Sequence, residues 1–433
     1  MTPPPQPAAA MPQPAATIRP APSAPSQVTM GSGPWIVPAV VLLVAPLFAI
    51  AALKIFEVER ATVLFVEYAC MAVAAFAVIG TLPPRAPVRL KSPIGKAMLF
   101  FVGSLLLTTT LVYVAEIRTD TSKFLPQVAA ILFLTLAFFV LEGAAKRADA
   151  ERAVLLTCHT VLGLSAASVL GDFLHITHYE TNHGRYFGFL GDGVAWALTL
   201  PLVVYFCSKR LVLVAICAVV IALTGSRAPA LCVAAALLLL IAVGRGRRLQ
   251  YLMLSALAVI AIYQSDVFTT LGERLSATHL SSSDRLTTAA LGIKVFENSP
   301  VFGSGYNAQA YYFPSNARRI ALGQYSIQTS TFVQMLAEGG LLLFGAYLAF
   351  VITATVGGIS LVRRSQAFRN SGILNGVVVW LLSMLWMNQS AAWFLVGSYT
   401  GTLILGMAGV VSGYYARLRY SRGQGLVAQG GQR

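Results

Sequence analysis

Residues 266–330 read DVFTTLGERLSATHLSSSDRLTTAALGIKVFENSPVFGSGYNAQAYYFPSNARRIALGQYSIQTS. They form the only long polar interval between two apolar parts of the chain. Both of those parts consist mostly of segments long and apolar enough for membrane helices. We therefore expect this loop to hold a large substrate outside the lipid and to carry half of an active site. Arginines near the ends of membrane helices are expected to supply the other half.

The composition indicates that lipid surrounds most of the chain. Of 433 residues, 57% are hydrophobic and 11% are charged, whereas soluble domains carry about 25% charged residues. A net charge of +15 would suggest nucleic acid as the partner of a soluble protein. Basic residues at cytoplasmic helix ends explain it better here, so no nucleic-acid partner is expected. The five cysteines lie in apolar runs without CxxC spacing, which disfavours a disulfide framework or a zinc site.

The hydropathy pattern predicts an all-α polytopic membrane protein with about twelve transmembrane helices. The stretches that qualify are Trp35–Phe56, Ala61–Leu82, Ala97–Glu116, Pro126–Ala145, Ala153–Phe173, Phe189–Ser208, Leu211–Gly225, Ala228–Gly244, Leu249–Ser265, Thr331–Gly358, Asn375–Trp393 and Gly397–Tyr415. Nine helices thus fall in residues 34–265 and three in 331–415, separated by a periplasmic loop at 266–330.

Lysines and arginines concentrate in alternate loops, which sets the expected orientation. The residues concerned are Arg85, Arg89, Lys91, Lys96, Lys146, Arg147, Arg152, Lys209, Arg210, Arg245, Arg247, Arg248, Arg363, Arg364, Arg369, Arg417, Arg419 and Arg422. All of these loops fall on one side, which we predict to be the cytoplasmic face of a bacterial inner membrane. Both termini then lie inside. Residues 1–33 are predicted to be a disordered cytoplasmic tail, because their Pro, Ala, Gln and Ser cannot bury enough surface to offset ordering, and 416–433 a second cytoplasmic tail.

Three histidines, His175, His178 and His183, cluster in one outer loop. With Glu180 or Asp172 they could ligate zinc. The histidine spacings of three and five residues fit no strong template, so no metal is expected. Two alternatives remain, a solvated polar loop and polar contacts to a sugar, for which His183 is the candidate.

Arg227 follows Gly225 and Ser226 at the end of a predicted membrane helix. An arginine there is costly unless it has a partner or lines a cavity. Its planar guanidinium matches phosphate oxygens and stays protonated at any working pH, which favours an anion site. The alternative is a side chain that extends to the interface.

The polar loop itself carries an N-cap signal at residues 281–284, which ends in Asp284. Apolar residues then recur at near-helical spacing up to Pro300, at Leu286, Ala289, Ala290, Ile293, Val295 and Phe296. This pattern predicts an amphipathic helix on the outer membrane surface. Arg285 would lie in its first turn, where the helix dipole disfavours a cation. Such a placement indicates function, with a surface accident as the alternative.

Two further features follow along the chain. Gly303 and Gly305 permit tight turns or close approach to a ligand, and Tyr306 opens a run of aromatics suited to a sugar or to lipid headgroups. Glu338 lies about two turns into the predicted tenth helix, where a carboxylate is a functional candidate. A structural partnership with Arg227 or Arg285 is its alternative.

The order of these motifs resembles the O-antigen ligase and polymerase superfamily of bacterial membrane glycosyltransferases. The elements that carry the resemblance are Gly225-Ser226-Arg227, Asp284-Arg285, Asn298-Ser-Pro300-x-Phe-Gly303-x-Gly305, Gln334-x-x-Ala-Glu338-x-Gly340 and, upstream, Arg185-x-x-Gly188 with Gly191-Asp192-Gly193. The resemblance covers roughly residues 150–415. It implies transfer of a glycan from a polyprenyl diphosphate to an acceptor hydroxyl at the outer face of the membrane, without metal, nucleotide sugar or other cofactor.

By position, the resemblance assigns the diphosphate to Arg227 and Arg285. Arg185 is a third candidate for the same contact. Glu338 is the first candidate for a general base, followed by Asp284 and His183. Ligases of this family carry His-Asn where this chain has Thr329 and Ser330. We therefore expect a polymerase that joins lipid-linked repeat units into an exopolysaccharide or O-antigen, with a chain-length regulator and export machinery as possible partners. A ligase acting on a lipid A core, a transporter of repeat units and a structural partner of a secretion complex are the alternatives.

Overall fold

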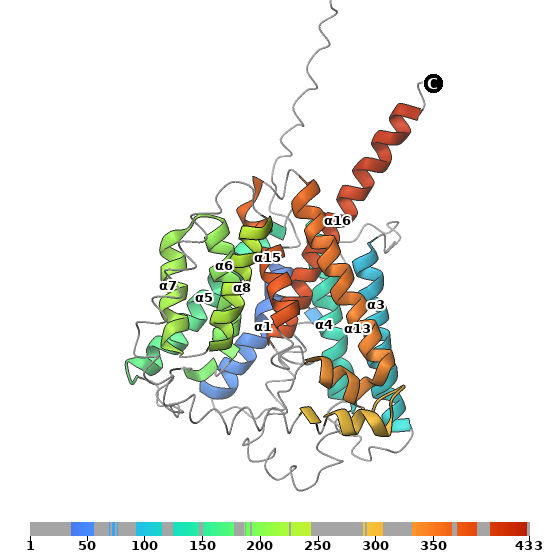
Figure 1. Ribbon diagram of the computed structural model, residues 1–433. Helices are drawn as coiled ribbons and strands as arrows, with labels where there is room; N and C mark the ends of the chain where they lie inside the picture. The colour runs from blue at the N-terminus through green and yellow to red at the C-terminus, as the bar shows by residue number, and fades with distance from the viewer. Residues whose placement is uncertain are drawn as a thin grey trace, which may run out of the picture. The chain divides into compact units, whose positions relative to one another are not determined.

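The computed structural model describes residues 36–55, 69, 72–73, 76, 92–114, 124–146, 150–176, 186, 188–190, 193–224, 227–243, 289–290, 292–305, 331–365, 370–387 and 399–430. Within these residues the protein is all helical and no strand occurs. The helices are α1 (Ile36–Ile55), α3 (Pro93–Val114), α4 (Phe124–Lys146), α5 (Ala150–Phe173), η2 (Gly188–Leu190), α6 (Gly193–Cys207), α7 (Leu211–Leu223), α8 (Arg227–Val243), α13 (Thr331–Arg364), α15 (Gly372–Met387) and α16 (Tyr399–Gly430). Figure 1 shows the long helices running side by side.

The predicted helical class is therefore confirmed for the described residues. Three helices there are long and apolar enough to cross a membrane, namely α3, α5 and α13. Shorter apolar helices accompany them, including α7 and most of α15. The predicted spans Ala61–Leu82 and Leu249–Ser265 lie almost wholly outside the described residues, so the number twelve stays a prediction.

Two helices differ from the sequence prediction. Helix α16 continues to Gly430 instead of ending at Tyr415. Helix α13 includes the predicted span Thr331–Gly358 and continues to Arg364, and its backbone is non-helical at Gly340. Hydropathy alone does not register this break, since apolar residues continue on both sides of it.

Glycines bring α4 and α16 into backbone contact. A Cβ atom added at Gly409 would clash with Phe138 O of α4, and one at Gly413 would meet Glu142 O at 2.5 Å. Small residues at such spacing let membrane helices approach closely and gain van der Waals contact. One turn of this interface also holds a buried polar pair, in which Ser412 Oγ donates to Glu142 Oε1 at 3.0 Å. This pairing attaches the C-terminal helix to the rest of the bundle.

We expect Gly409→Ala to destabilise the protein by about 1–3 kcal/mol, the usual cost of inserting a methyl into a packed interface. The added carbon meets backbone, which cannot rotate away as a side chain can. Thermal denaturation in detergent, followed by tryptophan fluorescence, measures the effect. Gly163→Ala in α5 is the matched control because nothing lies within 4 Å of its added Cβ. Equal stability of the two variants would contradict the close packing.

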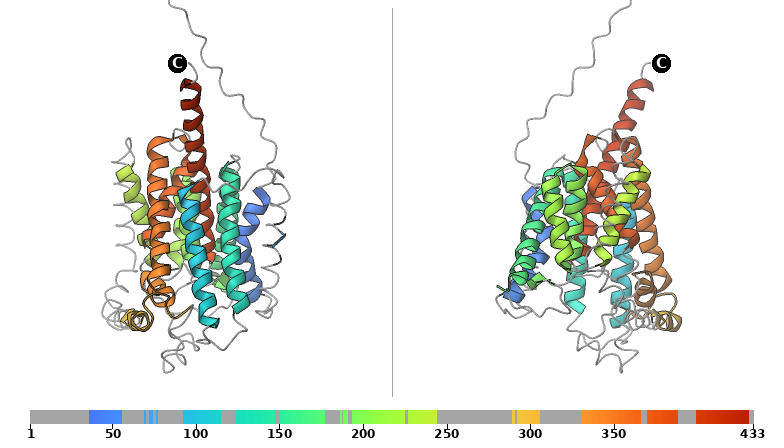
Figure 2. Two further views of the ribbon diagram at one scale, coloured as in Figure 1. Left: turned by 90° about the vertical axis from the view of Figure 1, so that its right-hand side faces the viewer. Right: turned by 60° about the vertical axis from the view of Figure 1, so that its left-hand side comes forward.

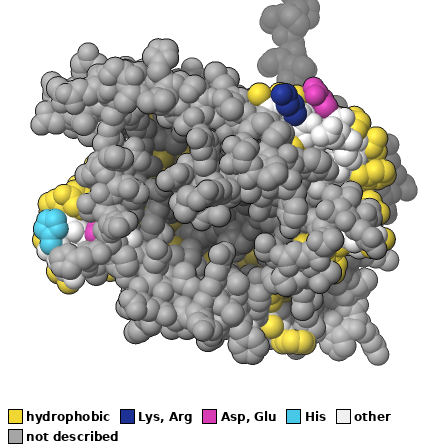
Figure 3. Space-filling model, turned by 90° about the horizontal axis from the view of Figure 1, so that it is seen from below, with side chains coloured by type: hydrophobic (Ala, Val, Ile, Leu, Met, Phe, Trp, Pro, Cys, Tyr) yellow, Lys and Arg dark blue, Asp and Glu magenta, His cyan; other side chains and the backbone are white. Residues whose placement is uncertain are grey.

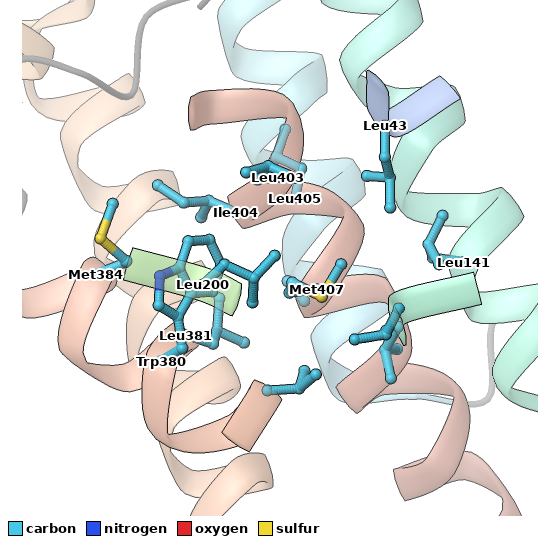
Figure 4. Packing of buried hydrophobic residues seen from close by; sticks show 14 of the residues in the cluster. Leu43, Leu141, Leu200, Trp380, Leu381, Met384, Leu403, Ile404, Leu405 and Met407 are labelled. Carbon is cyan, nitrogen blue, oxygen red and sulfur yellow. The ribbon is translucent and has the colours of Figure 1, made fainter. Parts of the chain in front are cut away.

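The centre of the core is built around Trp380 of α15. Its side chain is fully buried, and its Nε1 donates to Thr199 Oγ1 of α6 at 2.7 Å. Figure 4 shows Trp380 and Met384 beside Leu200 of α6 and Ile404 of α16. A buried indole N–H needs such an acceptor, so this hydrogen bond fixes the register between α6 and α15.

Inter-helix contacts show which helix termini share an end of the bundle. Helices α6 and α15 run antiparallel, since Gly372 lies against Cys207 while Trp380 reaches Thr199. Cys232, early in α8, contacts Met384, late in α15, at 3.3 Å. Helices α13 and α15 are antiparallel through the contacts Thr355–Trp386 and Gly358–Val378. Helices α13 and α3 are antiparallel as well, because Gly357 lies against Ile94 near the start of α3.

These contacts define one end, which we call the lower end after its place in Figure 1. It holds the starts of α6, α8 and α13 and the ends of α3, α5, α7 and α15. The opposite, upper end holds exposed Lys209, Arg210, Arg363 and Arg364. Figure 2 shows the C-terminal part of α16 extending from this upper end. Lys294, in the short helix at residues 292–298, is an exposed basic residue outside this group. Which end faces the cytoplasm stays a prediction.

Candidate functional site

The site is built around the break in α13. Gly340 has φ 61° and ψ −160°, a region of backbone space that is essentially restricted to glycine. A break inside a helix leaves carbonyls before it and N–H groups after it without intrahelical partners. In a membrane protein such groups must find partners within the protein.

Residues 299–305, which we call the strap, supply those partners. The hydrogen bonds are Ser304 N to Ala337 O (3.0 Å), Gly305 N to Glu338 O (2.9 Å), Leu341 N to Pro300 O (2.8 Å) and Leu342 N to Val301 O (3.2 Å). Two orphan carbonyls and two orphan N–H groups are thereby satisfied by one short segment. The strap and the break therefore form a single unit, and each requires the other.

The two glycines of the strap have positive φ angles, 70° at Gly303 and 85° at Gly305. A Cβ at Gly303 would clash with the backbone of Glu338 and Gly339, and one at Gly305 would clash with Val112 of α3. The sequence predicted tight turns or close approach to a ligand; in the structure Gly303 approaches the backbone of α13, and Gly305 approaches the side chain of Val112. A substrate contact by either glycine stays a prediction.

Glu338 is the last residue but one before the break, and its side chain is 6% exposed. Gln334, one turn earlier and 3% exposed, donates from Nε2 to Glu338 Oε1 at 3.1 Å. Among the described residues no group lies within hydrogen-bonding distance of Gln334 Oε1. No role was predicted for Gln334, although its spacing of four residues from Glu338 on a helix was the signal that could have paired them.

The short helix before the strap matches the predicted amphipathic helix where it is described. Residues 289–290 and 292–298 are helical, and Ser304 Oγ donates to Val295 O at 3.4 Å. Val295 and Ala337 form a small buried cluster of their own. Figures 1 and 2 show this segment, in gold, lying across the lower end instead of along the bundle axis. The strap thus attaches the helix of the polar loop to α13.

A second attachment at the lower end joins η2 to α5 and α7. Gly188 N donates to Asp172 Oδ2 at 3.2 Å, and Leu190 N donates to Ser168 Oγ at 3.1 Å. On the other side, Tyr186 N donates to Leu223 O at 3.3 Å. Asp172, weighed as a zinc ligand from the sequence, therefore binds a backbone N–H in the structure.

His175 likewise has a backbone role at the end of α5. It adopts φ 56°, and Ile176 N donates to Gly171 O at 2.9 Å, a pattern typical of helices that end in a left-handed residue. Its side chain is exposed. In the described part of the chain no group of three or more His, Cys, Asp or Glu side chains is arranged to hold a metal ion.

The other predicted site residues are placed only in part. Arg227 is the first residue of α8, two residues beyond the described end of α7, and its side chain lies outside the described set. Also outside the described residues are Arg185, His183, Asp284, Arg285, Tyr306, Thr329 and Ser330. The structure therefore brings together Gly303, Gly305 and Glu338, and it places the start of α8 at the same end of the bundle.

Figure 3 views the lower end directly. Where side chains are described, hydrophobic ones predominate near the rim, with a histidine on one side and one basic beside one acidic side chain on the other. Exposed apolar residues also cover the flanks of α3 and α7, including Phe100, Leu107, Val212 and Val219. Flanks of this kind suit lipid contact and leave the polar chemistry to the end of the bundle.

Comparison with known proteins gives one family. Residues 212–348 match the family model described as O-antigen ligase. No curated protein is similar enough to the chain to be matched. The matched stretch begins in α7, includes Arg227 and the strap, and ends just after the break in α13. The match over residues 212–348 supports the resemblance to the O-antigen ligase and polymerase superfamily that the motifs carry.

Proposed function

We propose that this protein is a glycosyltransferase of the bacterial inner membrane. It polymerises polyprenyl-diphosphate-linked oligosaccharide repeat units into an exopolysaccharide or O-antigen at the periplasmic face. The observation that carries the proposal is the strap bound into the broken helix beside Glu338, at the same end of the bundle as the start of α8. Both features lie within the stretch that matches the family model.

The length of α13 supports a substrate at the lipid boundary. Residues 341–364, the part after the break, number 24 and extend about 36 Å at 1.5 Å per residue. That length alone exceeds the roughly 30 Å of a bilayer core, and Arg363 and Arg364 lie at its far end. Glu338 then lies at headgroup level, where the diphosphate of a prenyl-anchored donor must also lie because its chain stays in lipid.

The reaction we propose breaks the bond between the donor's anomeric carbon and the diphosphate oxygen. The diphosphate leaves with the electron pair, and the guanidinium groups of Arg227 and Arg285, with Arg185, stabilise its charge. The acceptor hydroxyl oxygen forms the new bond to the anomeric carbon. Its proton passes to the Glu338 carboxylate, or to Asp284 or His183, acting as a weak base. Gly303, Gly305 and Tyr306 would contact the sugars, and no metal or cofactor takes part.

The rest of the architecture is part of the proposal. Residues 266–330 form the periplasmic loop, both termini are cytoplasmic, and the basic upper end faces the cytoplasm. A chain-length regulator and the export machinery are the protein partners that a polymerase would meet.

A ligase that transfers the glycan to a lipid A core is the second candidate, because the matching family model is described as O-antigen ligase. The sequence feature against it is Thr329-Ser330 in place of His-Asn. An imidazole gains and loses its charge near neutral pH and can act as a base there, whereas an alcohol hydroxyl does not. This difference favours polymerisation.

The test uses the full-length protein in liposomes supplied with undecaprenyl-diphosphate-linked repeat units and, separately, with lipid A core. We expect a ladder of longer glycans with repeat units alone, unaffected by EDTA. A single transfer that requires lipid A core would identify the ligase instead. Accumulation of unchanged repeat units inside sealed vesicles would identify a transporter, and it would overturn the proposal.

Glu338→Gln should lower the transfer rate by about 10²-fold, the smaller end of what a general base contributes. The amide keeps an oxygen that can accept the hydrogen bond from Gln334 Nε2, so folding should be preserved. Rates with lipid-linked repeat units, measured at matched protein levels, check the result. A variant as fast as the wild type would remove Glu338 from the chemistry and leave it a structural role.

A further inference from the structure

Asp172 carries a buried carboxylate that the proposed reaction does not use. It lies at the end of α5, is 3% exposed, and accepts a hydrogen bond from Gly188 N at 3.2 Å. A charged side chain in a membrane helix is costly unless its interactions compensate for burial. Its position 16 residues before its partner means that the contact fixes one segment of chain upon another.

The segment it fixes is held at three points. Besides the Asp172 contact, Leu190 N donates to Ser168 Oγ at 3.1 Å, and Tyr186 N donates to Leu223 O at 3.3 Å. Gly188 adopts φ 58°, and an added Cβ would clash with Ser168 O of α5. A glycine is therefore required for the chain to pass this closely over α5.

The third point joins this segment to the end of α7, which lies close in sequence to the start of α8. Leu223 is the last residue of α7, and Arg227 begins α8 only four residues later. Tyr186 in turn directly follows Arg185 in the sequence. Anchoring residues 186–190 between α5 and α7 thus limits how far the backbone of Arg185 can lie from the α7–α8 turn, because consecutive Cα atoms are about 3.8 Å apart.

We propose that Asp172 is a positioning residue, which holds residues 186–190 so that Arg185 approaches the same diphosphate as Arg227. This inference rests on the proposed function. Asp172 does not touch substrate and acts through Gly188. A carboxylate suits this task because its hydrogen bonds to backbone N–H groups are charge-assisted and stronger than neutral ones.

The experiment compares Asp172→Ala with Asp172→Asn in the full-length protein in nanodiscs. Hydrogen–deuterium exchange is followed in peptides covering residues 186–190. We expect faster exchange of the Gly188 and Leu190 amides in Asp172→Ala and near-normal protection in Asp172→Asn, which keeps an acceptor oxygen. Leu170→Ala, at a 40% exposed position on the same helix, is the control. It should leave the exchange rates of both the Gly188 and the Leu190 amides unchanged.

The transfer assay then separates positioning from mere stability. We expect Asp172→Ala to lower kcat by about 10²-fold, the effect of misplacing a catalytic contact by about 1 Å, and Asp172→Asn to restore most of it. The double variant Asp172→Ala with Arg185→Ala should be no slower than Arg185→Ala alone, because both changes remove the same contact. Additive losses would overturn the inference.

Failure of the proposed function would look different. If the wild type transfers no glycan, that function is overturned, and the link to Arg185 falls with it. Unchanged protection of residues 186–190 in Asp172→Ala would overturn the anchoring itself, whatever the activity. Lost protection with full activity would overturn the positioning role and leave the glycan-transfer proposal standing.

Discussion

Gly340→Ala is expected to cause the largest loss of stability of any single methyl addition in α13. The substitution forces a side chain into a backbone region that costs non-glycine residues about 1–3 kcal/mol. The added Cβ would also lie 2.5 Å from Val301 O and 2.7 Å from Gly303 N, so the strap must move. Displacing it exposes four backbone hydrogen bonds, each worth about 0.5–1.5 kcal/mol net. A total of about 3 kcal/mol or more follows.

The half-life of the folded protein in detergent at elevated temperature measures this effect, because unfolding of large membrane proteins is commonly irreversible. Gly345→Ala is the matched control in the same helix, since nothing lies within 4 Å of its added Cβ. Alanine favours a helix by up to about 1 kcal/mol over glycine, so this control should be neutral or more stable. If both variants last equally long, the break is not held by the strap.

Arg227→Ala and Arg285→Ala should have the largest effects on activity. Removing one charged donor from a preorganised anion site costs about 10²–10³-fold in rate. Lysine substitutions should recover only part of the loss, because an ammonium lacks the planar fork that binds two phosphate oxygens. Rates with lipid-linked repeat units, together with the length of the glycans formed, provide the measurement.

Arg363→Ala is the control for that experiment. It removes an exposed arginine from the upper end of α13, so it changes the net charge equally without touching the proposed site. We expect normal glycan length. Undiminished polymer from Arg227→Ala and Arg285→Ala together would refute the phosphate contacts, whereas equal losses in all three variants would point to a general effect of charge.

The sequence predicted the helices well because hydropathy reports directly on burial in lipid. The boundaries of α5, α7 and α8 lie within three residues of their predicted positions at both ends. Chain order also indicates which helix ends share a side, because antiparallel neighbours alternate. The orientation predicted from charge bias stays a prediction. These properties are local, or follow from chain order alone.

The break at Gly340 and the anchor at Asp172 depend instead on contacts between distant segments. Gly339-Gly340 was visible in the sequence, but a glycine pair alone does not predict a helix break. The strap that stabilises the break lies some 35 residues away. Asp172 resembled a metal ligand because histidines follow it. Only the fold shows that its carboxylate faces the Gly188 N–H. Contacts between segments distant in the chain leave no periodic pattern in the sequence from which they could be predicted.

The order of synthesis gives the strap a further significance. Residues 299–305 leave the ribosome before α13 does, so their donors and acceptors must stay hydrated until that helix is inserted. The nine residues 331–339 span about 14 Å at 1.5 Å per residue and cannot cross a bilayer alone. Pairing of the strap with α13 and completion of α13 therefore become one late event in biogenesis. A ribosome stalled before residue 340 would leave a chain in which the strap has no partner.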